Sequence, residues 1–244
     1  MWNSKTATGI SVKTLELYAI VFGCRLLSIM RHQGYLPYDK SGNNKNMFFV
    51  ISFINVVTFS MYYSGDWFYH FIEIISMGAT CLAIYGIFGP LVSTYDEKFD
   101  KFGHAHIPNE FGIAYIAGPC ILLAIIFHPS LNREFFSDTC WTISMYVEAA
   151  AMFPQLYMFQ KQAGDTGGKV ETLTGHTVFA LAFARVFELI FWSGSFSELK
   201  GFSGYLILLS QLLHLAIMAD FFYYYFVSVA KGLPMELPTS QSLV

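Results

Sequence analysis

Charged side chains are scarce in this chain of 244 residues. Asp, Glu, Lys and Arg make up only 13% of it, whereas hydrophobic residues make up 55% and aromatic residues 18%. Soluble domains have about 25% charged residues. The composition therefore excludes an ordinary soluble domain and indicates a membrane protein. The net charge of −3 provides no basic surface for nucleic acid, so we expect no nucleic-acid partner.

Metal-binding, redox and catalytic patterns are also missing. The four cysteines are not arranged as CxxC, and we expect them to be reduced, with no disulfide or metal site. The sequence has no HExxH, P-loop, GxSxG or dinucleotide-binding pattern. We therefore expect a protein that is not an enzyme and uses no cofactor. The polar first 18 residues do not resemble a cleaved signal peptide.

Long apolar runs dominate what is present. A bilayer core needs about 20 mostly apolar residues per helix. Seven runs qualify as candidate spans, at residues 14–32, 46–63, 69–94, 111–128, 136–160, 174–193 and 203–230. The segments between them are too short to separate domains. The pattern predicts an all-α membrane protein, a single transmembrane domain over residues 1–244 built as a polytopic bundle of six to seven spans.

The distribution of Lys and Arg between the loops indicates the orientation. If the 46–63 run does not cross and the C-terminus is cytosolic, seven basic residues face the cytosol and five face the other side. The cytosolic set is Lys5, Lys13, Lys98, Lys101, Lys161, Lys169 and Lys231. Because cytosolic loops carry the excess of basic residues, this orientation is favoured.

A few ionisable residues lie inside the predicted spans, where charge is costly and usually faces a cavity or a partner. They are Glu16, Arg25, Glu73, Glu148, Arg185, Glu188, His214 and Asp220. Arg185 and Glu188 are three residues apart on one helix face and can neutralise each other. Arg25, Glu148 and Asp220 need partners on neighbouring helices. Two interpretations stay open: a polar cavity for a charged or zwitterionic ligand, or interhelical ion pairs that only fix packing.

Several segments resemble one known family. These are "GISVKTLELYAIVFGCR" (9–25), "CWTISMYVEAAAMFPQL" (140–156), "LTGHTVFAL" (173–181) and "ADFFYYYFVSVAKG" (219–232). In this order they are similar to segments of the ER lumen protein retention (KDEL) receptors. The resemblance implies a seven-span fold like that of SWEET and PQ-loop proteins. The first of these segments resembles the family's second helix, so we expect a divergent or truncated member that lacks the first.

The resemblance also implies a function. The family binds the C-terminal KDEL- or HDEL-type tetrapeptide of escaped ER proteins and returns them from the Golgi in coatomer-coated vesicles. The expected location is therefore the ER and Golgi membranes, as a multi-pass protein. The tail keeps Lys231 but has no cluster of lysines, so coatomer binding is expected to be weakened.

The resemblance assigns ligand contacts to five residues. Arg25 matches the arginine that holds the ligand's carboxylate, a role that suits a guanidinium fork. Asp138 and Trp141 match the pair that receives the lysine or histidine four residues from the ligand's end, through charge and a cation–π face. Arg185 matches an arginine of the family's sixth helix, and Trp192 matches a tryptophan that lines the cavity.

Further residues are assigned to the cavity and its switch. Glu148 is implied to be a buried carboxylate whose pairing changes when ligand binds. Asp220 matches a required aspartate of the last helix. Pro154 and Gln155 match the PQ motif, in which proline breaks the helix and frees carbonyls. Glu188 stands where the family has a tyrosine, and is included in the cavity group.

Other positions depart from the family pattern. Ala184, Ser195 and Ser28 replace a tyrosine, an arginine and an acidic residue respectively. These changes leave two alternatives to the retrieval receptor: a SWEET/PQ-loop-type transporter of small solutes, or a trafficking paralogue without ligand. Residues 43–63 have no counterpart in the family and are interpreted as an apolar insertion. An unspliced intron and a re-entrant hairpin are both compatible with that run.

Overall fold

The computed structural model describes residues 6–30, 66–104, 108, 111–131, 134–166, 170, 172–194, 196, 202–233 and 235. The predicted insertion at 43–63 lies outside these residues. The described helices are α1 (Val12–Ile29), α3 (Asp66–Phe88), η1 (Val92–Thr94), α4 (Ala114–Ile126), α5 (Phe135–Ala150), α6 (Phe153–Thr166), α7 (Thr172–Gly194) and α8 (Phe202–Lys231). No strand occurs among the described residues, so the all-α prediction is confirmed for that part of the chain.

Three of the described helices are long and apolar enough to cross a membrane. They are His70–Phe88 in α3, Thr174–Gly194 in α7, and the whole of α8. α4 is apolar but shorter, with Pro119 inside it. By length and composition, these helices are those of a multi-pass helical membrane protein.

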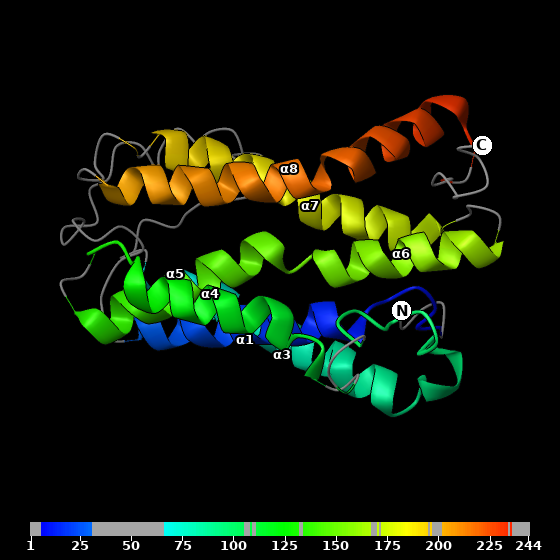
Figure 1. Cartoon of the computed structure of the whole chain (residues 1–244), viewed down its shortest axis with the longest axis horizontal. Helices are drawn as coiled ribbons and strands as arrows, with labels where there is room; N and C mark the ends of the chain where they lie inside the picture. Colours follow the sequence, from blue (N-terminus) through cyan, green and yellow to red (C-terminus); the bar gives the residue numbers. More distant parts are fainter. Residues whose placement is uncertain are drawn as a thin grey trace.

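The helices form two groups that meet along the middle of the molecule. α1 packs against α3 and α5, α4 packs against α5, and α7 packs against α8. Figure 1 shows α7 and α8 along one side and α1, α3, α4 and α5 along the other. Contacts of α5 with α8 connect the two groups, and α6 packs against α1.

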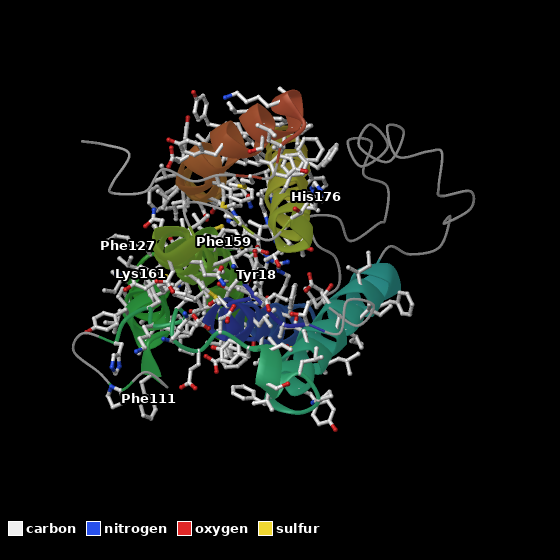
Figure 2. The ribbon with its side chains drawn as sticks, turned by 90° about the vertical axis from the view of Figure 1, so that its right-hand side faces the viewer. Tyr18, Phe111, Phe127, Phe159, Lys161 and His176 are labelled. Atoms are coloured by element: carbon white, nitrogen blue, oxygen red, sulfur yellow. The ribbon has the colours of Figure 1, made fainter. Side chains whose placement is uncertain are left out.

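The buried apolar core lies between these groups. Phe159 of α6 and Leu17 of α1 are fully buried, and they belong to one cluster with Val147 of α5 and Met218 of α8. Figure 2 shows Tyr18 and Phe159 toward the centre. Aromatic residues outside the core, such as Phe111 at 61% exposure, project outward, as expected where lipid replaces water.

The predicted span at 136–160 is not one continuous helix, and the break expected from its proline is present. α5 ends at Ala150 and α6 begins at Phe153. Pro154 occupies the second position of α6, where its missing N–H costs no helix bond. In an uninterrupted helix its ring would clash with the carbonyl of Ala150. The predicted 69–94 span is also too long, since α3 ends at Phe88 before the Gly-Pro pair at Gly89.

Gln155, the second residue of the PQ motif, connects this break to the start of α1. Its side-chain nitrogen donates to the Gly9 carbonyl at 2.7 Å, and its oxygen accepts from the Ser11 N–H at 3.0 Å. Gly9 has a φ of +76°, a left-handed conformation that favours glycine. Gln155 is 4% exposed, so both bonds are sheltered. The motif therefore fixes the chain that enters α1.

Asp100 caps the same helix end from the loop after η1. Its carboxylate accepts from the Ser11 hydroxyl at 2.8 Å, the Val12 N–H at 2.8 Å and the Tyr95 hydroxyl at 2.7 Å. Asp100 is fully buried. Burial, and then the neighbouring Asp100 carboxylate, raises the pKa of Tyr95, which stays protonated as a donor. The start of α1 is thus fixed by two other segments of the chain.

Candidate ligand-binding pocket

One face of α5 supplies three residues of the candidate site. Trp141, Met145 and Glu148 follow one another at intervals of four and three residues, which aligns their side chains on a helix. All three are buried, with exposures of 7%, 5% and 4%. The Ser144 hydroxyl beside them donates to the Trp141 carbonyl at 2.6 Å. The sequence therefore turns a single stripe of α5 toward the protein interior.

α7 presents a matching stripe. Arg185, Glu188 and Trp192 are spaced by three and four residues and share a face. The rings of Trp192 and Trp141 meet edge to face, with centroids 5.7 Å apart. This arrangement is one that aromatic pairs prefer. The two tryptophans therefore join α7 to α5 at one end of the site.

A chain of ion pairs crosses four helices beside the tryptophans. Glu148 of α5 pairs through one oxygen with Arg25 of α1, and through the other with Arg185 of α7 at 2.6 Å. Arg25 also reaches Glu73 of α3 at 3.1 Å, and Arg185 reaches Glu188 at 2.5 Å. Buried charges are tolerated when they are paired in this way. The pairing of Arg185 with Glu188 along one helix is confirmed.

α8 closes the site with polar residues. The Gln211 side-chain nitrogen donates to Glu188 at 3.2 Å. Ser210 donates to the Met145 carbonyl at 3.2 Å, which ties α8 to α5. His214, one turn further along α8, is 2% exposed and lies in the electrostatic field of Arg185 and Glu148. α8 thus brings a neutral amide and an imidazole to the charged cluster.

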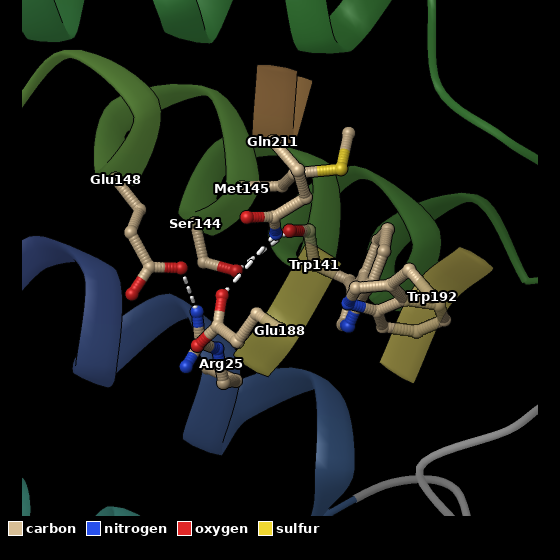
Figure 3. Close-up of a pocket in the computed structure, with 8 residues that line it drawn as sticks. All are labelled: Arg25, Trp141, Ser144, Met145, Glu148, Glu188, Trp192 and Gln211. Atoms are coloured by element: carbon tan, nitrogen blue, oxygen red, sulfur yellow. Dashed lines mark hydrogen bonds and ion pairs between the residues drawn. The ribbon is translucent and has the colours of Figure 1, made fainter. Parts of the chain in front are cut away.

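These residues surround a pocket between α1, α5, α7 and α8. Its cavity volume is about 10 Å³, room for about one water molecule, so the lining side chains must move apart to admit a larger ligand. Figure 3 shows its lining, in which Glu148 is joined to Arg25, Glu188 is joined to Gln211, and two indole rings lie beside them. The lining residues are Arg25, Trp141, Ser144, Met145, Glu148, Glu188, Trp192 and Gln211. The pocket can offer a cation to a ligand carboxylate, and carboxylates and aromatic faces to a ligand cation.

The structure brings most of the predicted site residues together. Arg25, Trp141, Glu148, Glu188 and Trp192 all line the pocket. Their burial and pairing fit both interpretations of the sequence, a polar cavity and interhelical ion pairs that fix packing. Their roles in ligand binding stay predictions.

Three predicted residues lie elsewhere. Arg185 is 7% exposed and contacts the pocket through its pairs with Glu148 and Glu188. Asp138 is 1% exposed in the first turn of α5, one turn before Trp141 and on the same face. Asp220 is exposed on α8, and the ion pairs of the described residues do not include it. Its switch role is a prediction that this geometry does not support directly.

Sequence reasoning did not assign a site role to some residues that the structure places there. Glu73 completes the ion-pair chain, and its only sequence signal is a charge inside an apolar run. Gln211 and Ser144 are polar residues in apolar helices, a weaker signal of the same kind. Among the described residues, no group of three His, Cys, Asp or Glu residues is placed to hold a metal ion.

Comparison with known proteins agrees with this architecture. The family model described as ER lumen protein retaining receptor matches residues 6–195. The chain is 29% identical to the ER lumen protein-retaining receptor 2 of Xenopus laevis over 238 residues, covering 98% of this chain and 89% of that protein. It is 28% identical to the ER lumen protein-retaining receptor of Petunia hybrida over 236 residues, covering 96% and 87%.

A second plant protein gives the same result. The ER lumen protein-retaining receptor B of Arabidopsis thaliana is 28% identical over 234 residues, covering 96% of this chain and 87% of that protein. The matches include the segments that form α1, α5 and α7. The chain therefore belongs to the ER lumen protein retaining receptor family.

Proposed function

We propose that this protein is a membrane receptor that binds the C-terminal tetrapeptide of escaped ER proteins and returns them from the Golgi to the ER. The observation that carries the proposal is the pair of buried arginines, Arg25 and Arg185, held on either side of Glu148 next to a pocket. A receptor for a C-terminus needs a cation at the end of a closed pocket. Arginine suits it because its fork can donate two parallel hydrogen bonds to one carboxylate.

Binding of a ligand carboxylate is an exchange of partners. Arg25 already has two carboxylate partners, so the ligand replaces one of them. The polar network can reorganise around Glu148, because this carboxylate would keep Arg185 when Arg25 turns to the ligand. The role proposed for Glu148 is therefore to hold the cation ready and to release it. This matches the switch expected from the resemblance.

The other end of a tetrapeptide carries a lysine or histidine in the expected signals. Asp138 and Trp141 lie three residues apart on one face of α5, and both are buried. A carboxylate beside an indole ring can hold a cation by charge and by the cation–π interaction. We assign this end of α5 to the basic residue of the ligand.

The relatives' names place them at ER lumen protein retention, and we extend that role to this chain as a receptor without enzymatic activity. Its proposed location is the ER and Golgi membranes, with retrieval by coatomer-coated vesicles. Lys231 lies in the last turn of α8 and is exposed. One lysine offers little charge to a coat, so we expect coatomer recruitment to be weak.

A retention assay in cells depleted of their own ER retention receptors tests this function. A lumenal reporter ending in His-Asp-Glu-Leu should be retained when this protein is expressed. The same reporter with its terminus masked by added glycines should be secreted. Arg25→Lys should cause the unmasked reporter to be secreted as well, because a single ammonium cannot replace the fork. Secretion of the unmasked reporter despite correct membrane localisation of the receptor would contradict the proposal.

A further inference from the structure

The Tyr18 hydroxyl is a buried polar group outside the ion-pair network. Tyr18 is 5% exposed, and its hydroxyl has no hydrogen-bond partner in the part of the chain that the structure describes. A buried hydroxyl without a partner lowers the stability of a fold, so a group of this kind needs a physical reason. Figure 2 shows Tyr18 toward the centre of the molecule, where the helices meet.

The register between α1 and α5 places Tyr18 beside the end of α5. Ser28, near the end of α1, contacts Ser137 in the first turn of α5, and their hydroxyl oxygens are 2.9 Å apart. The N–H of Ser11, at the start of α1, donates to Gln155, just after the helix break. α1 is therefore antiparallel to this part of the chain. Tyr18 lies between the two contacts and so faces the last turns of α5.

Tyr18 is accordingly a neighbour of Glu148. It belongs to the same buried apolar cluster as Val147, the residue before Glu148. It also interacts electrostatically with Arg185 and with Glu148 itself. Tyr18 and Arg25 are seven residues apart, which is two turns of α1, so they share a helix face. α1 thus brings both a guanidinium and a hydroxyl to one carboxylate.

The proposed binding of a ligand carboxylate leaves Glu148 short of one partner. When Arg25 turns to the ligand, Glu148 keeps Arg185, which it contacts through its other oxygen. The oxygen that Arg25 leaves belongs to a side chain that is only 5% exposed. A buried carboxylate oxygen without a donor is costly, so the exchange is favoured when another donor takes the place of Arg25.

Other polar neighbours of Glu148 are already engaged or cannot donate. The Ser144 hydroxyl donates to a backbone carbonyl of α5 at 2.6 Å, and the Gln211 amide donates to a different carboxylate at 3.2 Å. One ring nitrogen of His214 donates to the Glu148 backbone carbonyl, whereas Nε2 has no partner among the described residues. In a neutral imidazole only the donating nitrogen carries a proton, so this Nε2 can accept but not donate.

We propose that Tyr18 is a positioning residue that donates its hydroxyl to Glu148 when Arg25 turns to the ligand carboxylate. The inference rests on the proposed function and deepens it, because it names the group that stabilises Glu148 in the bound state. A hydrogen bond from a hydroxyl to a carboxylate is short and charge-assisted. Here it uses a donor that has no partner in the unbound protein, so Tyr18 stabilises the bound state selectively.

Replacement of Tyr18 by phenylalanine separates this role from a structural one. Tyr18→Phe removes only the hydroxyl. It should weaken the binding of a labelled free-acid peptide ending in His-Asp-Glu-Leu at least about tenfold, or about 1.4 kcal/mol. The melting temperature of the unbound protein should stay equal or rise, because the hydroxyl that is lost has no partner there. A hydroxyl that stabilised the unbound fold would give a lower melting temperature instead.

Tyr95→Phe is the matched control. The Tyr95 hydroxyl donates to Asp100 at 2.7 Å, and neither residue lines the pocket. Its removal should lower the melting temperature, because a hydrogen bond of the unbound protein is lost. The affinity for the peptide should change by less than about twofold. The two substitutions are therefore expected to have opposite effects on affinity and stability.

Infrared difference spectroscopy adds a measurement that does not depend on the folding of a variant. Binding of the free-acid peptide to wild-type protein should shift the C–O stretching band of a tyrosine, since its hydroxyl becomes a donor to a carboxylate. Incorporation of ring-labelled tyrosine identifies the band. The shift should be absent in Tyr18→Phe and present in Tyr95→Phe.

Failure of this inference is distinguishable from failure of the function on which it rests. If wild-type protein binds the free acid and not its C-terminal amide, then equal affinity of Tyr18→Phe and wild type overturns the inference alone. The absence of a tyrosine band shift on binding does the same, as does a Tyr18→Phe protein that has both lower affinity and a lower melting temperature. Equal binding of acid and amide to wild type, or no binding of either, overturns the proposed function and the inference with it.

Discussion

The Arg185 guanidinium of α7 lies 2.6 Å from the Glu148 carboxylate of α5, and both side chains are almost fully buried. The other oxygen of Glu148 pairs with Arg25 of α1. One carboxylate thus joins two arginines from separate helices. Because α7 belongs to one group of helices and α1 to the other, this residue holds the groups together as well as lining the pocket.

Removal of the charge on Glu148 should be strongly destabilising. Glu148→Gln leaves the buried guanidinium groups of Arg25 and Arg185 without the carboxylate that they share. Breaking a buried ion pair costs about 3–5 kcal/mol. We expect a loss of this size in the free energy of unfolding, measured by equilibrium unfolding in mixed detergent micelles.

An exposed ion pair provides the control for Glu148. Lys98 and Asp165 are 3.0 Å apart, but their side chains are 65% and 62% exposed. Asp165→Asn should therefore change the free energy of unfolding by no more than about 1 kcal/mol. Equal changes in the free energy of unfolding for the two substitutions would contradict a stabilising role for the Glu148 ion pairs.

Gln155 should stabilise the start of α1. Gln155→Ala removes a donor to Gly9 and an acceptor for the Ser11 N–H in a buried place, where an unsatisfied group costs about 1–3 kcal/mol. The amides of residues 6–12 should exchange hydrogen for deuterium faster in this variant, as measured by mass spectrometry. Gln160→Ala, an exposed position on the same helix, should leave the exchange unchanged. Unaltered exchange in Gln155→Ala would contradict this role.

Asp100 should contribute to the same region through its three accepted hydrogen bonds. Asp100→Ala leaves the Val12 N–H and the Ser11 and Tyr95 hydroxyls without this acceptor, and we expect a larger fall in melting temperature than for Asp100→Asn. The asparagine retains one oxygen and fits the same space. Glu97→Ala, in the same loop but exposed, is the control. A melting temperature of Asp100→Ala equal to that of the control would argue against the cap.

Much of the fold was predictable from the sequence, because long apolar runs in a chain with few charges have few interpretations. The PQ motif predicts a helix break near Pro154, whereas hydropathy alone predicts one uninterrupted span over residues 136–160. In the structure the break follows Ala150. Hydropathy averages over about 20 residues, so it cannot detect a two-residue interruption. The interruption is indicated by Pro154 itself, since proline has no N–H and its ring clashes with the preceding turn of a helix.

The candidate site was predictable to the extent that buried charges are rare. Arg25, Glu148 and Arg185 stand out in apolar helices, and the structure places them in contact. Asp220 carries the same signal, yet it is exposed. A charge inside an apolar run does not reveal which face of the helix the residue occupies. The partner of Arg25 on α3, Glu73, could not be chosen over other carboxylates without knowing which helices are neighbours.

The hydrogen bonds of Gln155 and Asp100 were beyond prediction from sequence patterns. They join residues that are 146 and 88 positions apart, and polar residues near helix ends are common. Local rules assign caps to neighbouring residues such as Ser11, which does accept from the Thr14 N–H. A cap supplied by a distant loop depends on the packing of the whole chain.

The central claim is that the pocket recognises a free carboxyl terminus, and peptide binding to the purified protein tests it most directly. A labelled peptide ending in His-Asp-Glu-Leu is compared with its C-terminal amide at about pH 5.5 and about pH 7.2, across the range in which histidine titrates. The account predicts that the free acid binds and that amidation weakens binding at least about a hundredfold. Equal binding of the two peptides, or no binding of the free acid to folded protein at either pH, would contradict it.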